Sequence, residues 1–108
     1  GKPEATPPAA APGGGKLEMG GNYNYTYSGP DELAPLQVYD DGISTYFKYQ
    51  DASQPLPNAY TVSADRQETP VAHYVQNGFM VVDAVSGEWV LKSGAGVIMV
   101  YNEAVNPR

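Results

Sequence analysis

Residues 36–49 read Leu-Gln-Val-Tyr-Asp-Asp-Gly-Ile-Ser-Thr-Tyr-Phe-Lys-Tyr, and this stretch decides the fold. An Asp-Gly pair between alternating apolar residues indicates a β-hairpin with a type I′ turn, because both central positions of that turn need positive φ. We expect Asp41 and Gly42 to occupy those two positions. The pairs that follow from this register are Asp40–Ile43, Val38–Thr45 and Leu36–Phe47. Leu36, Val38 and Phe47 then share one face, as a half-buried antiparallel pair requires.

The composition around this hairpin predicts an all-β domain. The chain has 108 residues, among them 12 glycines, 10 prolines and nine tyrosines. It has many turn signals and no helical periodicity, which is typical of all-β proteins. It has no cysteine, which excludes disulfides and thiolate zinc sites. The net charge of −6 comes without a basic patch, so direct nucleic-acid binding is disfavoured. No apolar run approaches the roughly 20 residues that a membrane-spanning helix needs.

The N-terminal stretch differs from the rest of the chain. Residues 1–21 are rich in Pro, Ala and Gly and carry few apolar side chains whose burial would offset the loss of chain entropy. We interpret them as a flexible linker between domains, in preference to a cloning remnant, and residues 22–108 as a β-sandwich domain. Because the chain starts within this linker, we interpret it as a fragment of a longer protein.

Residues 22–28 read Asn-Tyr-Asn-Tyr-Thr-Tyr-Ser, and their strict alternation predicts a strand. Tyr23, Tyr25 and Tyr27 would share one face of it. That face either covers the core of the sandwich or forms a strip for another chain. The strand carries no charge to protect an open edge, so it is a candidate for strand addition by a peptide or a neighbouring subunit. The three tyrosines are therefore the candidate partner-binding residues.

Turn signals also organise the second half of the chain. Asn77-Gly78 predicts a hairpin between residues 69–76 and 79–85, and Ser86-Gly87 predicts another between 79–85 and 88–92. Two-residue turns place on one core face Val71, His73, Val75, Met80, Val82, Ala84, Trp89 and Leu91. Residues 97–101 are apolar on both faces, as expected of a strand with neighbours on either side. The total is seven or eight short strands, which indicates an antiparallel β-sandwich or a small, partly open barrel.

Catalytic groups are sparse in this sequence. His73 is the only histidine, and its place on the apolar face favours a hydrogen-bonded core residue over a base or ligand. Asp40 and Asp41 are explained as turn residues, since Asp bonds its own backbone there. No nucleophile elbow, phosphate loop or metal-binding motif occurs. We therefore expect no enzyme, no metal and no cofactor.

Two other functions compete with a role in protein assembly. One is a soluble β-sandwich that binds carbohydrate or peptide, with Tyr23, Tyr25, Tyr27 or Trp89 as a stacking platform; the expected core position of Trp89 argues against it there. The other is a hydrolase that acts through Asp40, Asp41 and His73. If the two carboxylates only form a turn, exchanging Asp41 for Asn leaves function intact.

The hairpin sits in a longer pattern that resembles a known family. Residues 33–47 follow the pattern L-A-P-x-x-V-Y-D-D-G-x-x-T-Y-F, which is similar to the signature of the CagX/TrbG family, the ninth VirB component of type IV secretion systems. Leu-Pro before an aromatic strand follows at residues 56–60. Leu-Lys-Ser-Gly at 91–94 stands where the family has Leu-Arg-x-Gly, so Lys92 departs from the pattern. The likeness runs in order over residues 22–102 and resembles the family's C-terminal domain.

The resemblance implies a structural protein of the periplasm, associated with the outer membrane. It implies a β-sandwich that binds a small lipoprotein, the seventh VirB component. It also implies packing beside the channel-forming tenth component and self-association of the full-length protein into a ring. The family supplies no residue motif for the lipoprotein contact that can be carried onto this sequence.

Overall fold

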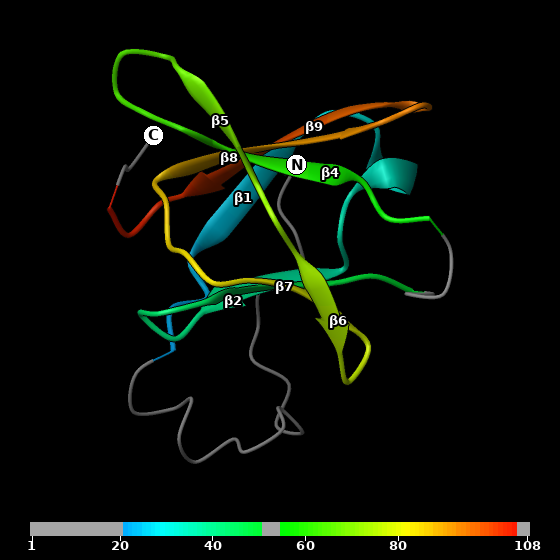
Figure 1. The fold of residues 1–108 in the computed structure, drawn as a ribbon, viewed down its shortest axis with the longest axis horizontal. Coiled ribbons are helices and arrows are strands. Elements are labelled where there is room, and N and C mark those ends of the chain that lie inside the picture. The colour runs from blue at the N-terminus through cyan, green and yellow to red at the C-terminus, as the bar shows by residue number, and fades with distance from the viewer. Residues whose placement is uncertain (1–20, 51–54, 106–108) are drawn as a thin grey trace.

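The computed structural model describes residues 21–50 and 55–105, which form two β-sheets packed face to face (Figure 1). The elements in chain order are β1 (Tyr25–Ser28), the 3₁₀ helix η1 (Asp31–Leu33), β2 (Gln37–Asp40), β3 (Thr45–Lys48), β4 (Asn58–Val62), β5 (Glu68–Val71), β6 (Tyr74–Gln76), β7 (Phe79–Val82), β8 (Glu88–Ser93) and β9 (Gly96–Asn102). One sheet has the order β1-β9-β8-β4-β5 and the other β2-β3-β7-β6, all antiparallel. The predicted β-sandwich is confirmed. The predicted linker lies outside the described residues, apart from Gly21.

The core lies between the two sheets. Trp89 of β8 meets Phe47 of β3 edge to face, with 5.3 Å between ring centroids, so the two sheets share one aromatic contact at their centre. Both side chains are completely buried. The other buried members of this core are Tyr25, Val38, Ala59, Met80, Val82, Leu91, Ile98 and Val100. Burial of this apolar surface is the main force that holds the sheets together.

The hairpin of β2 and β3 forms, but its predicted register is wrong by two residues. Val38 pairs with Phe47 and Asp40 with Thr45. A shift of two residues keeps every side chain on its predicted face, because side chains alternate with a period of two. Val38 and Phe47 are therefore buried as expected, whereas Leu36 lies outside the ladder and is 47% exposed.

The reason for the shift is a four-residue loop in place of the two-residue turn. The backbone N–H of Asp41 donates to the carbonyl of Ser44 at 3.1 Å. The Asp41 carboxylate accepts in return from the N–H groups of Ile43 and Ser44, at 2.9 and 2.8 Å. Gly42 has a φ of +90°. The Asp41 side chain thus closes a wider loop than the Asp-Gly pair alone indicates.

The hairpin at Asn77 and Gly78 has the predicted register. Val75 pairs with Met80 across a two-residue turn. Asn77 and Gly78 have φ values of +54° and +82°, the pair of positive angles that a type I′ turn requires.

Two predictions in the second half of the chain are wrong. The expected strand 69–76 is two strands: β5 belongs to the five-stranded sheet and β6 to the four-stranded sheet. The expected hairpin around Ser86-Gly87 is a crossing between sheets, since β7 and β8 lie in different sheets. The alternation of apolar and polar residues indicates which side of a strand is buried. It does not change when the chain passes from one sheet to the other, so it does not reveal the crossing. β9 lies between β1 and β8, which agrees with its apolar character on both faces.

Candidate partner-binding edge

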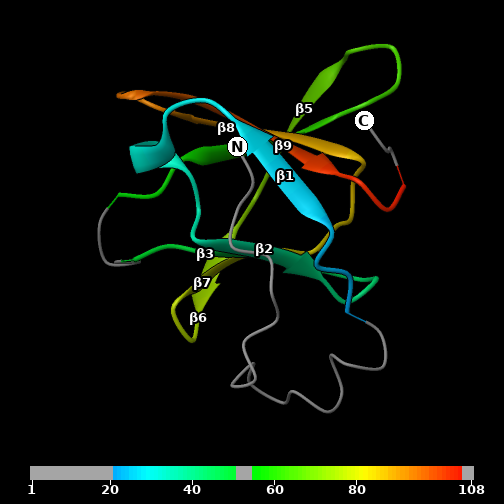
Figure 2. The same ribbon diagram turned by 180° about the vertical axis from the view of Figure 1, so that it is seen from behind.

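β1 is the outermost strand of the five-stranded sheet and pairs only with β9. Figure 2 shows it with β2 on the near side of the sandwich, whereas β5 and β6 lie on the side that Figure 1 presents. Just before β1, the N–H of Glu103 donates to the carbonyl of Asn24 at 2.8 Å. Because backbone groups alternate in direction along an antiparallel strand, this bond fixes the direction of every later residue in β1.

The alternation turns the backbone of Thr26 and Ser28 toward β9 and that of Tyr25 and Tyr27 toward the open edge. The N–H of Tyr25 donates to the carbonyl of Tyr23 at 2.9 Å and is therefore occupied. The open edge then presents the N–H of Tyr27 and the carbonyls of Tyr25 and Tyr27. These groups are what a partner strand would pair with.

The other three sheet edges are less accessible to a partner. β6 has only three residues. The edge of β2 is already occupied at one end, where Asn22 and Asp40 exchange two backbone hydrogen bonds of 2.8 and 3.0 Å. Short edge strands and covered edges are ways in which proteins avoid unwanted pairing.

β5 is protected by a proline. The N–H of Ser63 donates to the carbonyl of Gln67, which fixes the alternation of the β4–β5 pair and turns the backbone of Pro70 outward. Pro70 has no N–H to offer at that edge. β1 is thus the longest edge strand among the described residues that lacks a proline, a bridge or a charged side chain.

Tyr25 is a core residue and not part of an exposed strip. Its side chain is completely buried, and its hydroxyl donates to Asp40 Oδ2 at 2.6 Å. Burial, followed by the bond to the Asp40 carboxylate, raises the pKa of Tyr25 well above its usual value. Asn22 Nδ2 donates to the same carboxylate oxygen and to Asn102 Oδ1, each at 2.9 Å. This network joins the two sheets beside the N-terminal end of β1.

Tyr27 lies at the border of the core. Its ring packs against the core cluster, while its hydroxyl donates to Asp31 Oδ1 at 2.6 Å. That hydrogen bond is the main reason why the pKa of Tyr27 is raised. Tyr27 is the member of the predicted trio that combines a half-buried ring with an outward-facing backbone.

Tyr23 lies away from the other two tyrosines, on the outer face of the four-stranded sheet. It stacks on Tyr39, with 4.9 Å between ring centroids, and Tyr39 stacks on Tyr46 at 4.7 Å. Phe79 meets Tyr39 and Tyr46 edge on. Burial raises the pKa of both Tyr39 and Tyr46 to about 12. The sequence analysis missed this outer aromatic cluster, although alternation places Tyr39 opposite in direction to Val38.

The remaining candidate residues perform local structural roles. Asp40 binds Tyr25 and also accepts from the Gly42 N–H at 2.9 Å, and Asp41 closes the β2–β3 loop. His73 is half-buried in the link between β5 and β6, so its predicted core position is wrong. In the part of the chain that the structure describes, no three His, Asp or Glu side chains come together in a way that could hold a metal ion.

The carbohydrate hypothesis placed a stacking platform at Tyr23, Tyr25, Tyr27 or Trp89, and three of these four side chains are packed within the protein. Tyr25 and Trp89 are completely buried, and Tyr23 is stacked within the outer aromatic cluster. Within residues 21–50 and 55–105, no helix is long and apolar enough to cross a membrane.

Fold and edge together define a small antiparallel β-sandwich in which β1 is an edge strand. The sequence profile of the CagX family, described as conjugal transfer proteins, matches residues 4–103. The chain therefore belongs to the CagX family, as its motifs predicted, and it is a VirB9-type component of a type IV secretion system.

Individual relatives agree with this assignment. The chain is 31% identical to protein virB9 of Agrobacterium fabrum over 86 residues, which cover 80% of this chain and 29% of that protein. It is 36% identical to the type IV secretion system protein PtlF of Bordetella pertussis over 76 residues, 70% of this chain and 28% of PtlF. It is 33% identical to the type IV secretion system protein virB9 of Brucella abortus over 92 residues, 80% of this chain and 32% of the relative.

The chain thus spans less than a third of the length of the curated relatives it matches. The family is structural and non-enzymatic, and it works in the core complex of a secretion system of the bacterial envelope.

Proposed function

We propose that this domain is an interaction module of the outer-membrane core complex, and that it binds a small lipoprotein by adding a strand of the partner to β1. The observation that carries the proposal is the open edge of β1, where the Tyr27 N–H faces outward. The other three sheet edges, at β2, β5 and β6, are protected. Main-chain hydrogen bonds supply affinity in this mode of binding, and side-chain pockets supply specificity.

Family membership supports a wider setting for the proposal. The domain would act in the periplasm at the outer membrane, beside the channel-forming component, within a ring that the full-length protein forms. A rigid sandwich without a catalytic cluster in its described residues is suited to such a scaffold role.

Amide hydrogen exchange followed by NMR tests the proposed strand addition. The probe is the N-terminal segment of the small lipoprotein encoded with the same secretion system. In the free domain we expect the Tyr27 amide to exchange rapidly, and the Thr26 and Ser28 amides to be protected by their pairing with β9. On binding, the Tyr27 amide becomes protected, because it then donates to the added strand.

The neighbouring amides are the internal control, since the protection of Thr26 and Ser28 changes little. Binding that leaves the Tyr27 amide unprotected would discard β1 as the interface and keep a lipoprotein-binding role. A segment that does not bind at high concentration would overturn the proposed function.

A further inference from the structure

A cavity of about 430 Å³ opens at the end of the sandwich where β1 finishes. Its apolar walls are Leu33 of η1, Leu56 before β4, Leu91 of β8 and Ile98 of β9. The volume lies in the range of about 300–1,000 Å³ that is usual for ligand pockets. Because η1, which lines the cavity, begins three residues after the end of β1, the cavity lies near that end of the β1 strand.

Two glycines hold η1 close to this end of the sandwich. A Cβ on Gly96 would lie 2.8 Å from Leu33 Cδ1, and a Cβ on Gly29 would lie 2.7 Å from the carbonyl oxygen of Val97. The first approach is to the end of the flexible Leu33 side chain, whereas the second is to backbone, so Gly29 is the stricter of the two positions. The segment that leads into η1 therefore packs directly on β9 at Gly29.

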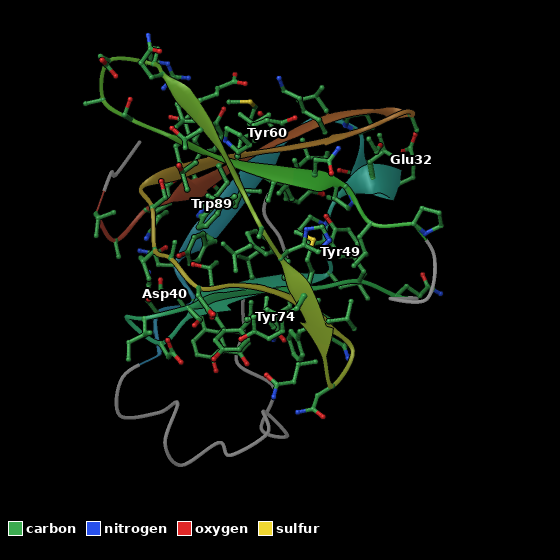
Figure 3. The ribbon with its side chains drawn as sticks, viewed as in Figure 1. Glu32, Asp40, Tyr49, Tyr60, Tyr74 and Trp89 are labelled. Atoms are coloured by element: carbon green, nitrogen blue, oxygen red, sulfur yellow. The ribbon has the colours of Figure 1, made fainter. Side chains whose placement is uncertain are left out.

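A buried hydroxyl lies in the lining without a partner. Tyr49 Oη is buried and makes no hydrogen bond to the described residues, and burial raises the pKa of Tyr49. A buried hydroxyl without a hydrogen bond is destabilising, so a polar group that enters the cavity gains by pairing with it. Figure 3 shows Tyr49 between the sheets, toward the same end of the sandwich as Glu32.

The mouth of the cavity is acidic. Asp31 and Glu32 are exposed and contribute to its lining, whereas none of the lining residues that the structure describes is Lys, Arg or His. A positive charge beside the apolar group of a ligand would therefore meet a complementary surface.

We propose that this cavity receives one apolar side chain of an extended peptide segment, with a Lys or Arg beside it that faces Glu32 and a peptide group that pairs with Tyr49 Oη. The proposal rests on the proposed function in one respect: the segment is the one that pairs with β1. The cavity then selects the partner's sequence, whereas the strand pairing depends on its backbone.

Exchange of Tyr49 for Phe separates binding from folding. Tyr49→Phe removes only the hydroxyl, so we expect the free energy of unfolding to stay the same or rise, because a buried unpaired group is lost. The affinity for the lipoprotein segment falls by about fivefold to tenfold, because one hydrogen bond in the complex is lost. Titration calorimetry measures the affinity and urea unfolding measures the stability.

The control for this variant is Tyr60→Phe. Tyr60 is half-buried on β4, outside the cavity lining, and its ring lies under Lys92 Nζ at 4.7 Å. Its exchange leaves the affinity for the segment unchanged. Equal affinities of Tyr49→Phe and wild type would overturn the role of the hydroxyl.

A charge reversal tests the acidic mouth. Glu32→Lys weakens binding of the segment several-fold, and the loss shrinks as salt is added, because exposed charges are screened. Asp65→Lys changes the net charge equally at the exposed β4–β5 turn and leaves the affinity nearly unchanged.

The outcomes distinguish this inference from the proposed function. If the segment protects the Tyr27 amide but Tyr49→Phe and Glu32→Lys bind it as tightly as wild type, the cavity proposal is overturned and strand addition stands. If the segment does not bind, the proposed function fails, and N-acetyl-tryptophanyl-lysine amide tests the cavity alone. Amide shifts confined to residues around Tyr49 and Leu56 would support the cavity, and their absence would overturn it.

Discussion

Gly29 occupies a position that only glycine satisfies, for two separate reasons. Its φ of +123° lies in a region that side chains disfavour, and an added Cβ would lie within 3 Å of both Val97 and Ile98. Gly42 has only the first constraint, because its φ is +90° and its Cβ would meet nothing within 4 Å. The two glycines therefore separate backbone strain from steric overlap.

We expect Gly29→Ala to destabilise the domain by about 3 kcal/mol or more, since strain and overlap add. Gly42→Val costs about 1–2 kcal/mol, because a β-branched residue resists positive φ in the β2–β3 loop. Gly94→Ala is the control, with ordinary φ and open space around its Cβ. Urea unfolding measures all three. Equal losses for Gly29→Ala and Gly94→Ala would contradict the close packing of this segment on β9.

The stability that Asp41 gives to the loop between β2 and β3 depends on pH. Partial burial alone would raise the pKa of Asp41, but the N–H groups of Ser44 and Ile43 and the Tyr46 hydroxyl outweigh it, so the pKa is lowered. A carboxyl whose pKa is lower in the folded state stabilises the fold above its unfolded pKa, near 4, and this stabilisation is lost as the pH falls through the folded pKa.

Asp41→Asn tests this dependence, since it keeps the shape and removes the charge. We expect the difference in unfolding free energy between wild type and Asp41→Asn to be constant at neutral pH and to shrink below about pH 4. Urea unfolding over a series of pH values measures it. Parallel curves down to pH 2 would show that the charge of Asp41 does not stabilise the loop.

The two outer strands of the five-stranded sheet differ in how they expose their backbone. The outward residue in the middle of β5 is Pro70, which has no N–H, whereas in β1 it is Tyr27, which has one. Under the proposed function, this difference makes the β1 edge receptive to a partner strand and the β5 edge inert. It also predicts that the inert edge can be opened by a single substitution.

Pro70→Val supplies the missing N–H without removing a bond to β4, because the nitrogen faces away from that strand. We expect stronger self-association than in wild type, measured by light scattering over a range of protein concentrations, because an unprotected edge pairs with other edges. Thr69→Val is the control, since the backbone of Thr69 faces β4. If Pro70→Val associates no more than Thr69→Val, the proline does not protect this edge.

At the level of elements, the sequence predicted strands and turns better than the sheets to which they belong. Asn77-Gly78 specifies its own register, because two positive φ angles fit one turn only. Asp41-Gly42 does not, because the Asp41 side chain stabilises a wider loop. The alternation of apolar and polar residues in 68–76 does not change where the chain passes from one sheet to the other. The crossing depends on pairing with strands that are distant in the sequence.

The candidate site was predictable to the same extent. The uncharged strand at residues 22–28 indicated an edge, and the structure places β1 at the edge of its sheet. The direction of Tyr23 was not predictable, because a bend, closed by the bond from the Tyr25 N–H to the Tyr23 carbonyl, interrupts the alternation. The cavity beneath η1 was also out of reach, since its walls come from four separate segments.

At the scale of the whole molecule, a buried hydrogen-bond network joins the two sheets beside the N-terminal end of β1. The Tyr25 hydroxyl belongs to the five-stranded sheet and Asp40 to the four-stranded sheet, and their 2.6 Å hydrogen bond is buried. Asn22 extends the connection from Asp40 to Asn102 of β9. A buried carboxylate that loses a donor is left poorly solvated, so this bond matters more than an exposed one.

Tyr25→Phe removes this one donor without changing the packing of the ring. We expect a loss of about 1.5–3 kcal/mol in the free energy of unfolding, as for a buried hydrogen bond to a charged group. Tyr27→Phe on the same strand removes the exposed bond to Asp31 and costs much less, because water replaces that bond. Urea unfolding compares the two. In an Asp40→Ala background, Tyr25→Phe costs little, because its partner is already absent; a full additional loss there would show that Tyr25 stabilises the fold through its other contacts and that the sheets are not joined through Asp40.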